Sequence, residues 1–321
     1  MNIVVADPNL VPHRERLETA VPSGSEVHWH IGGVPDQALR DVEVFIGSRF
    51  TADMAAMAKT LRLVHPAAAG TDKIDLAALP SDILVANTFH HERSIAEYVA
   101  GAAVMLRRGF LAQDAQLRRG VWATSVYDRS IPQPTTLSGA RIGFVGFGHI
   151  GRYSWKLLRA FGCTAAAVTG SGRVADECGL DWVGDTGQLH RLLRDCDVAV
   201  VSAPLNRHTE GMIGAGELEA LGPDGALINV GRGALVQERA LYDALTGGAI
   251  KGAAIDVWYR YPADGSGCPP SVLPFGELSN ILMTPHSSGV TTDTFTGRVD
   301  DVAANIGRLQ RGEPLHNLIP H

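Results

Sequence analysis

The chain has few cysteines and no long apolar run, and each shortage excludes a class of protein. Four cysteines occur in 321 residues, at Cys163, Cys178, Cys196 and Cys268, without Cys-x-x-Cys spacing or a pairing pattern. This usage argues against a disulfide-stabilised secreted domain. With no leader-like segment ahead of them, we expect a reduced, cytoplasmic compartment. No apolar run reaches the roughly 18 residues that a membrane-spanning helix needs, so we expect no membrane partner.

Charge is also scarce, and its balance is weakly acidic. Lys and Arg number 28 against 34 Asp and Glu, which gives a net charge of −6. This balance argues against nucleic acid or an anionic membrane surface as a main partner. Charged residues make up 19% of the chain and apolar residues 45%, a composition that favours a folded core. At about 150 residues per domain, the length suggests two domains.

Short β-rich runs alternate with helical patterns along most of the chain. Most are continuous runs of Val, Ile, Leu and Ala, which is typical of strands buried on both faces of a parallel sheet. The expected strands form two sets, residues 2–6, 26–30, 43–46, 62–65 and 83–86 in the first, and residues 141–146, 163–169, 197–203, 226–230, 253–257 and 281–284 in the second. Two such sets predict an α/β protein with two Rossmann-like, doubly wound parallel-sheet domains.

The segments around the second set complete the expected organisation. A helical stretch over residues 94–119 links the two sets, and the Ser94–Glu97 spacing predicts a capping box, so Glu97 is interpreted as structural. Residues 125–137, rich in Pro, Ser and Thr, predict a loop. Residues 291–312 look helical and are expected to pack back on the first domain. The predicted domains are therefore a discontinuous one, residues 1–98 and 288–321, and a second one, residues 99–287.

A glycine pattern follows the first strand of the second set. Gly146, Gly148 and Gly151 form a G-x-G-x-x-G between a strand and a helix. The first glycine permits the tight turn, the second lets the backbone approach a pyrophosphate, and the third lets helix and strand pack closely. His149 and Ile150 begin the helix, whose N-terminus supplies N–H donors. The sequence therefore predicts a dinucleotide site.

The end of the next strand bears on which dinucleotide is bound. NAD-selective sites usually carry Asp or Glu there, which accepts hydrogen bonds from the ribose hydroxyls. This chain has Thr169, Gly170 and Ser171, with Arg173 close by and no carboxylate among these residues. The pattern slightly favours NADP(H) over NAD(H), and the alternative is that Arg173 is a solvated surface charge.

Polar side chains follow three later strands of the same set. Arg232, Asp256 and His286 each come just after an apolar run. Residues at the carboxyl ends of parallel strands converge on the ligand crevice. An arginine can bind a carboxylate through two nitrogens, and a histidine can exchange a proton near neutral pH. The remaining histidines have no accompanying carboxylate or cysteine spacing, so we expect no metal site.

With these segments in place, the sequence resembles the D-2-hydroxyacid dehydrogenase family (D-isomer-specific, NAD(P)-dependent). The resemblance covers nearly the whole chain. Its motifs are residues 69–75 (Ala-Gly-Thr-Asp-Lys-Ile-Asp), the Ala96-Glu97 helix start, Gly120-Val121-Trp122, Leu137-Ser138-Gly139, the glycine fingerprint, Pro204-Leu205-Asn206 with Thr209, and the segments around Arg232 and His286.

The resemblance implies an active site in a cleft between two Rossmann-like domains. Arg232 would bind the substrate carboxylate and polarise the 2-oxo group, and His286 would act as general acid in reduction and as base in oxidation. Backbone N–H groups near Ala69 and Gly70 would hold the carboxylate, and a homodimer is expected. The residues assigned to the cofactor are Gly146, Gly148, His149, Ile150, Gly151, Thr169, Gly170, Ser171, Arg173, Ala203, Pro204, Thr209, Val230, Gly231, Asp256 and Gly289.

One catalytic position departs from the family. The acidic partner of the histidine falls on Tyr261, in a segment that usually reads Asp-Val-Phe-Glu-x-Glu-Pro, and Tyr259 replaces the other glutamate. A tyrosine is neutral at pH 7, so it would orient His286 without favouring the imidazolium by charge. We include Tyr261 among the catalytic residues on this basis.

The leading interpretation is an NAD(P)H-dependent reductase that converts a small 2-oxo acid into a D-2-hydroxy acid. One alternative is a family member that oxidises a simple anion. Formate dehydrogenases of the family have Gln at the Tyr261 position, and phosphite-oxidising members have Lys at the Ala69 position. A second alternative is a non-catalytic, cofactor-sensing binding protein, for which Arg232 and His286 would be superfluous.

Overall fold

The chain folds into two compact units, each built on one parallel sheet. The computed structural model describes residues 1–175, 179–262 and 267–321, so Cys178 lies outside the described residues. The first unit comprises Met1–His90 and Val290–His321, and the second comprises His91–Gly289. Their sheets have five and seven strands. The predicted α/β fold class with two doubly wound parallel sheets is confirmed.

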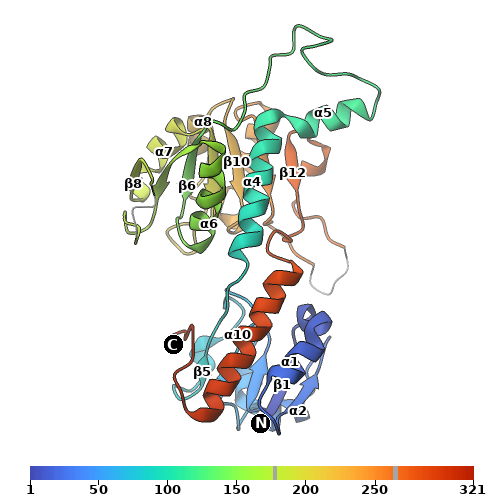
Figure 1. The fold of residues 1–321 in the computed structure, drawn as a ribbon, viewed down its shortest axis with the longest axis vertical. Coiled ribbons are helices and arrows are strands. Elements are labelled where there is room, and N and C mark those ends of the chain that lie inside the picture. Colours follow the sequence, from blue (N-terminus) through green and yellow to red (C-terminus); the bar gives the residue numbers. More distant parts are fainter. Residues whose placement is uncertain (176–178, 263–266) are drawn as a thin grey trace. The chain divides into compact units, whose positions relative to one another are not determined.

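The first unit has the strand order β2-β1-β3-β4-β5, all in parallel pairs. Helices α1 and α10 cover one face of this sheet, as Figure 1 shows, and α2 and α3 cover the other. Its elements are β1 (Asn2–Val5), η1 (Pro8–His13), α1 (Arg14–Ala20), β2 (Glu26–Trp29), α2 (Asp36–Arg40), β3 (Val44–Ile46), α3 (Ala52–Met57), β4 (Leu63–Val64), η2 (Leu76–Ala78), β5 (Leu84–Val85) and α10 (Thr292–Arg311), where η denotes a 3-10 helix.

Helix α10 matches the helix predicted at the C-terminus. The hydroxyl of Thr291 accepts the N–H of Thr294 at its start, and Gly312, at φ 68°, ends it in the left-handed conformation that glycine adopts without strain. Its apolar face is buried with strands β1 and β3, through the side chains Phe295, Val299, Val302, Ala303, Ile306 and Leu309. The expected packing on the N-terminal part of the chain is therefore present.

The second unit has the strand order β12-β11-β10-β9-β6-β7-β8, again in parallel pairs. Its strands are β6 (Arg141–Val145), β7 (Thr164–Val168), β8 (Trp182–Gly184), β9 (Val198–Val201), β10 (Ala226–Asn229), β11 (Gly252–Ile255) and β12 (Ile281–Met283). Strand β8 is missing from the sequence prediction because its three residues give no recognisable apolar run. The other strands coincide with predicted ones.

Helices cover both faces of this larger sheet. Helices α4 and α6 share a core with one face, visible in front of β6 and β10 in Figure 1, and α7, α8 and α9 pack on the other. The helices of the unit are α4 (Glu92–Arg108), α5 (Phe110–Leu117), α6 (His149–Leu158), η3 (Arg159–Phe161), η4 (Thr186–Gln188), α7 (Leu189–Asp195), α8 (Ala215–Leu221), η5 (Gly233–Leu235), α9 (Glu238–Thr246) and η6 (Phe275–Glu277).

The predicted helix over residues 94–119 is corrected in two respects. It breaks at Gly109, whose φ of 66° separates α4 from α5. The capping box at Ser94 is wrong, because the helix already begins at Glu92 and Ser94 lies in its first turn. There the Ser94 hydroxyl donates to the carbonyl of His91, a local bond that competes with capping. Glu97 is exposed on the helix surface.

The cysteines and the longest helices bear on the expected compartment of the protein. Cys163, Cys196 and Cys268 are free thiols, and burial raises the pKa of Cys196 to about 12. Among the residues that the structure describes, no helix is both long and apolar enough to span a bilayer.

Candidate active site

The turn after β6 is built as the glycine pattern predicts. Gly146 has φ 87°, and a Cβ there would lie 2.6 Å from the backbone nitrogen of Ala203. A Cβ at Gly151 would lie 3.1 Å from the Gly146 carbonyl oxygen, so this glycine permits close contact between α6 and the turn. Gly148, immediately before α6, faces open space, with no heavy atom within 4 Å of a Cβ placed there. The N-terminus of α6 is therefore open to a ligand.

The neighbouring strand ends meet this turn. Ala203 follows β9 and Gly231 follows β10, and a Cβ on Gly231 would lie 3.1 Å from the Ala203 carbonyl oxygen. Thr209 fixes the next turn, because its Oγ1 donates to Pro204 O at 2.7 Å and accepts from the N–H of Asn206 at 2.8 Å. Residues assigned to the cofactor from three separate segments thus lie side by side.

The loop after β7 is closed by its own threonine. Thr169 Oγ1 accepts the N–H of Arg173 and lies 3.1 Å from its carbonyl oxygen, and the Arg173 side chain is exposed. An acidic residue that the sequence reasoning missed lies nearby. Asp185 follows β8, its Cβ is 3.4 Å from a Cβ placed on Gly172, and its carboxylate accepts the N–H of Gly187.

Arg232 lies in a turn held by a buried amide. Asn229, at the end of β10 and 1% exposed, donates from Nδ2 to the Arg232 carbonyl and accepts the N–H of Gly231. Gly233 has no room for a side chain, because its Cβ would lie 2.3 Å from the carbonyl oxygen of Trp258. The Arg232 turn therefore packs directly on the segment after β11, which carries Tyr261.

Tyr261 lies against His286. Their ring centroids are 5.7 Å apart with the planes tilted by 54°. The Tyr261 hydroxyl accepts the backbone N–H of Trp258 at 3.0 Å. Burial raises the pKa of Tyr261 above its usual value, and the Trp258 N–H and the charge of Arg232 offset this only in part. Tyr261 is therefore neutral at physiological pH.

The loop that carries His286 is held by Asp256. This carboxylate follows β11, is 1% exposed, and accepts the Thr284 hydroxyl at 2.7 Å. On the other side of His286 it accepts the N–H of Ser287 at 2.9 Å and both the N–H and the hydroxyl of Ser288. The acceptor positions of Asp256 are thus occupied by the loop.

In the first unit, the residues expected to hold a carboxylate follow β4. The Ala69 carbonyl accepts Asn87 Nδ2 at 2.7 Å, and the Ala68 carbonyl accepts the N–H of Thr88. These two bonds tie the loop containing Ala69 and Gly70 to the residues after β5. The loop is half-buried.

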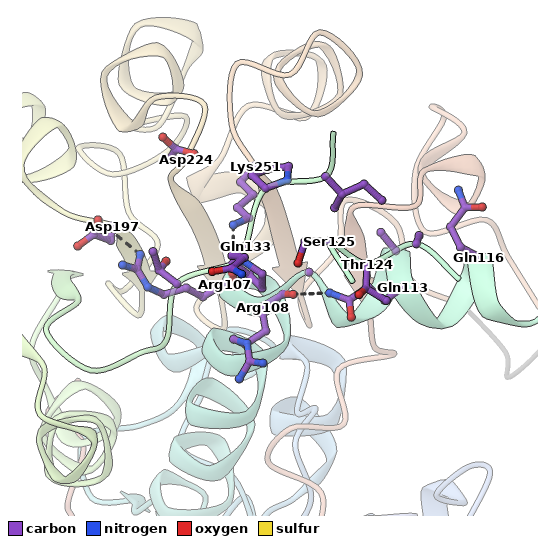
Figure 2. A pocket seen from close by; sticks show the side chains of 17 residues that line it. Arg107, Arg108, Gln113, Gln116, Thr124, Ser125, Gln133, Asp197, Asp224 and Lys251 are labelled. Carbon is purple, nitrogen blue, oxygen red and sulfur yellow. Dashed lines mark hydrogen bonds and ion pairs between the residues drawn. The ribbon is translucent and has the colours of Figure 1, made fainter. Parts of the chain in front are cut away.

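A cavity of about 840 Å³ lies elsewhere in the second unit, and none of the predicted site residues lines it. Its walls are the end of α4, α5 and the long loop that follows α5. Figure 2 shows Arg107 directed toward Asp197, at 3.5 Å, and the Gln113 amide bonded to the Arg108 carbonyl. These contacts are structural, since they join the helix end to its surroundings.

The second unit thus brings most predicted site residues to one edge of its sheet. Arg232, Tyr261 and His286 follow β10, β11 and β12, which are neighbours in the sheet, and the glycine turn follows β6 in the same sheet. An open glycine turn at a helix N-terminus, with an arginine and a histidine at neighbouring strand ends, defines the class of dinucleotide-dependent α/β oxidoreductases.

Comparisons with known proteins identify the family within this class. The family model "D-isomer specific 2-hydroxyacid dehydrogenase, NAD binding domain" matches residues 100–288. D-3-phosphoglycerate dehydrogenase of Escherichia coli (strain K12) is 32% identical over 292 residues, 88% of this chain and 68% of that protein. A formate dehydrogenase of Arabidopsis thaliana is 32% identical over 301 residues, 88% of this chain and 74% of that protein.

A solved structure shows the same fold. A D-isomer specific 2-hydroxyacid dehydrogenase family protein from Aeromonas salmonicida subsp. salmonicida A449 is 23% identical, with a TM-score of 0.83 covering 99% of this chain and 98% of that one. The protein belongs to the D-isomer-specific 2-hydroxyacid dehydrogenase family, and its second unit contains the NAD-binding domain.

Proposed function

We propose that the protein is an NAD(P)H-dependent reductase that converts a small 2-oxo acid into a D-2-hydroxy acid by reversible hydride transfer. The observation that carries this proposal is the placement of Arg232, Tyr261 and His286 after three neighbouring strands of the NAD-binding domain. A guanidinium to bind a carboxylate and an imidazole to exchange a proton are the two groups that this reaction requires of the protein.

Each residue has a separate part in the proposed reaction. Arg232 binds the substrate carboxylate and polarises the 2-oxo group. His286 gives a proton to the oxo oxygen during reduction and removes it during oxidation. The Tyr261 ring limits the movement of the imidazole. When bound, the nicotinamide dinucleotide supplies the hydride.

The open glycine turn supports a dinucleotide in the second unit. We assign its pyrophosphate to Gly146, Gly148, His149, Ile150 and Gly151, at the N-terminus of α6, where N–H groups and the helix dipole favour anions. Val230, Asp256 and Gly289 belong to the nicotinamide side of the proposed site. Four further residues are proposed to contact the cofactor: Ala203, Pro204, Thr209 and Gly231.

We further propose that NADPH serves at least as well as NADH. The loop after β7 presents Gly170, Ser171 and the exposed Arg173, without a carboxylate between Thr169 and Arg173 to repel a 2′-phosphate. Asp185 lies beside Gly172 of this loop, and its carboxylate caps the following turn.

The test is a panel of 2-oxo acids, including glyoxylate, hydroxypyruvate and phenylpyruvate, assayed with NADH and NADPH in parallel. We expect reduction of at least one acid to the D-product. Arg232→Ala should lose about a hundredfold in kcat/KM, because a charged contact worth on the order of 3 kcal/mol disappears. Near-wild-type efficiency in this variant would show that the carboxylate binds elsewhere.

The same assay separates the alternatives. Oxidation of formate or phosphite without reduction of any 2-oxo acid would show that the protein is instead a family member that oxidises a simple anion. Tight binding of NAD(P)H without turnover of any compound would identify a cofactor-sensing binding protein.

We also propose that the protein is a homodimer that associates through residues 110–136, called the extension below. In Figure 1 its green loop stands away from the rest of the second unit. Six large apolar side chains on it are exposed: Phe110, Leu117, Val121, Trp122, Val126 and Tyr127. Clusters of exposed apolar side chains mark association surfaces. In a twofold-symmetric dimer, the extension of each subunit would occupy the cavity beside the extension of the other subunit.

Light scattering after gel filtration tests the homodimer. We expect a dimer for the wild type and a monomer for Trp122→Glu, whose side chain is 60% exposed in the single chain. Leu157→Glu, at an exposed apolar position on α6, is the matched control and should remain dimeric. A monomeric wild type would exclude the proposal.

A further inference from the structure

The backbone of His286 adopts a conformation that a histidine does not prefer. Its φ is 57°, in the left-handed region where side chains with a Cβ are unfavourable. Residues held in this region persist where the surrounding structure fixes them, and they cluster at functional sites. The groups that fix this loop therefore control where the imidazole lies.

Those groups form a chain of hydrogen bonds that reaches another element. Asp256 binds the loop on both sides of His286, through Thr284 before it and Ser288 after it. The Thr284 hydroxyl also lies 3.1 Å from the hydroxyl of Tyr98, which is half-buried on α4. Figure 1 shows α4 running beside the strands of this sheet.

The direction of these bonds follows from proton counting. A threonine hydroxyl has one proton, and Thr284 gives it to the Asp256 carboxylate, which can only accept. The phenol of Tyr98 must therefore supply the proton between Tyr98 and Thr284. Burial raises the pKa of Tyr98 to about 12, so the phenol remains a donor throughout the neutral range.

We propose that Tyr98 is a positioning residue for His286, acting through Thr284 and Asp256, and this inference rests on the proposed role of His286 in proton transfer. Tyr98 holds the threonine hydroxyl in the orientation that meets the carboxylate. The carboxylate in turn holds Ser287 and Ser288, and so the strained backbone between them. Loss of the phenol frees Thr284 to rotate, and the imidazole loses its fixed place.

Three variants and a matched control test this chain. Tyr98→Phe removes the phenol, Thr284→Val removes the relay hydroxyl with little change in shape, and Thr284→Ser restores the hydroxyl. Tyr259→Phe is the control, because it also removes a half-buried phenol of the second unit. Its hydroxyl donates to the Val236 carbonyl at 3.0 Å and belongs to another contact.

Two readouts are needed, one of them independent of turnover. The first is kcat and KM for reduction of the best 2-oxo acid, with the Kd of NAD(P)H. The second is the histidine Cε1–H region of the NMR spectrum at fixed pH, in which the His286 resonance is assigned by its loss in His286→Gln.

We expect kcat to fall about tenfold in Thr284→Val and about three- to tenfold in Tyr98→Phe, with KM and the Kd of NAD(P)H little changed, because small misplacements of a catalytic group cost rate rather than binding. Thr284→Ser should recover most of kcat. The His286 resonance should shift or broaden in Tyr98→Phe and Thr284→Val, and it should stay in place in Tyr259→Phe.

The outcomes separate the two claims. An unmoved His286 resonance and an unchanged kcat in Tyr98→Phe would overturn the positioning role while leaving the proposed reaction intact. If His286→Gln retained full activity, the proposed reaction would fail, and the resonance alone would still decide whether Tyr98 fixes this loop. An equal loss in Tyr259→Phe would show a general packing effect and would overturn the inference.

Discussion

The glycine turn after β6 allows one prediction with a worked magnitude. Gly146→Ala places a methyl group in the left-handed region, which costs about 1–2 kcal/mol. The methyl would also lie 2.6 Å and 2.7 Å from backbone atoms of Ala203, which no side-chain rotation relieves. Overpacking of this kind costs about 1–3 kcal/mol. The free energy of unfolding should therefore fall by about 2–5 kcal/mol.

Gly148→Ala is the matched control with the opposite expectation. Its φ is −86°, and nothing lies within 4 Å of the added methyl, so stability should change by less than about 1 kcal/mol. The methyl would occupy the open space in front of α6, where we place the pyrophosphate. Affinity for NAD(P)H should fall at least about tenfold, which corresponds to about 1.4 kcal/mol.

Urea unfolding followed by circular dichroism and fluorescence titration with NADPH measure the two effects. With a slope of about 1–3 kcal/mol per molar urea, the midpoint of Gly146→Ala should fall by at least about 0.7 M. The reasoning is refuted if Gly148→Ala loses as much stability as Gly146→Ala. It is also refuted if Gly148→Ala binds NADPH as the wild type does.

Three further predictions concern charge and pH. Thr169→Asp should shift preference toward NADH in steady-state assays, because the carboxylate accepts ribose hydroxyls and repels a 2′-phosphate; an unchanged cofactor ratio would place the ribose elsewhere. Reduction requires protonated His286, so kcat/KM should fall as pH rises. Tyr261→Glu should move this decline to higher pH, since a carboxylate favours the imidazolium, whereas Tyr261→Phe should leave its position unchanged. Fully buried His65 accepts a bond from Asn305, and burial lowers its pKa to about 4. The His65 imidazole of the unfolded chain binds a proton near pH 6.5, whereas that of the folded chain does so only near pH 4. As the pH falls from about 6.5 to 4, the free energy of unfolding should therefore decline by roughly 3 kcal/mol. Urea titrations of His65→Gln should lack this decline.

The buried parallel strands were predictable because a strand covered on both faces must be apolar at nearly every position. The helix over residues 291–312 was predictable because a threonine and a glycine mark its ends. The start of α4 was not, since the Ser94–Glu97 spacing also occurs within a helix and the true start at Glu92 has no side-chain cap. Strand β8 was not predictable either, because Trp-Val-Gly does not form a continuous run of Val, Ile, Leu and Ala.

Some features of the candidate site could be predicted from local sequence, and others depend on tertiary packing. The glycine turn is a local signal, and its three glycines can be interpreted from spacing alone. The role of Tyr98 cannot be predicted from spacing, because Tyr98 and Thr284 are 186 residues apart and their contact depends on how α4 packs on the sheet. The contact between Tyr261 and His286 through their rings likewise required the structure, since the sequence indicated a hydroxyl bond as readily.

The division of the first unit between the two ends of the chain sets an order for its folding during synthesis. Strands β1 and β3 are made before the second unit, but the α10 side chains that cover one face of their sheet are made only after the whole second unit. The second unit is continuous and can fold completely in the interval. Until α10 has been made, the nascent N-terminal sheet carries an uncovered apolar face made of residues such as Ile3, Val5 and Ile46. That interval is when chaperones have a surface to bind, and a message truncated before codon 292 yields a chain that retains this surface permanently.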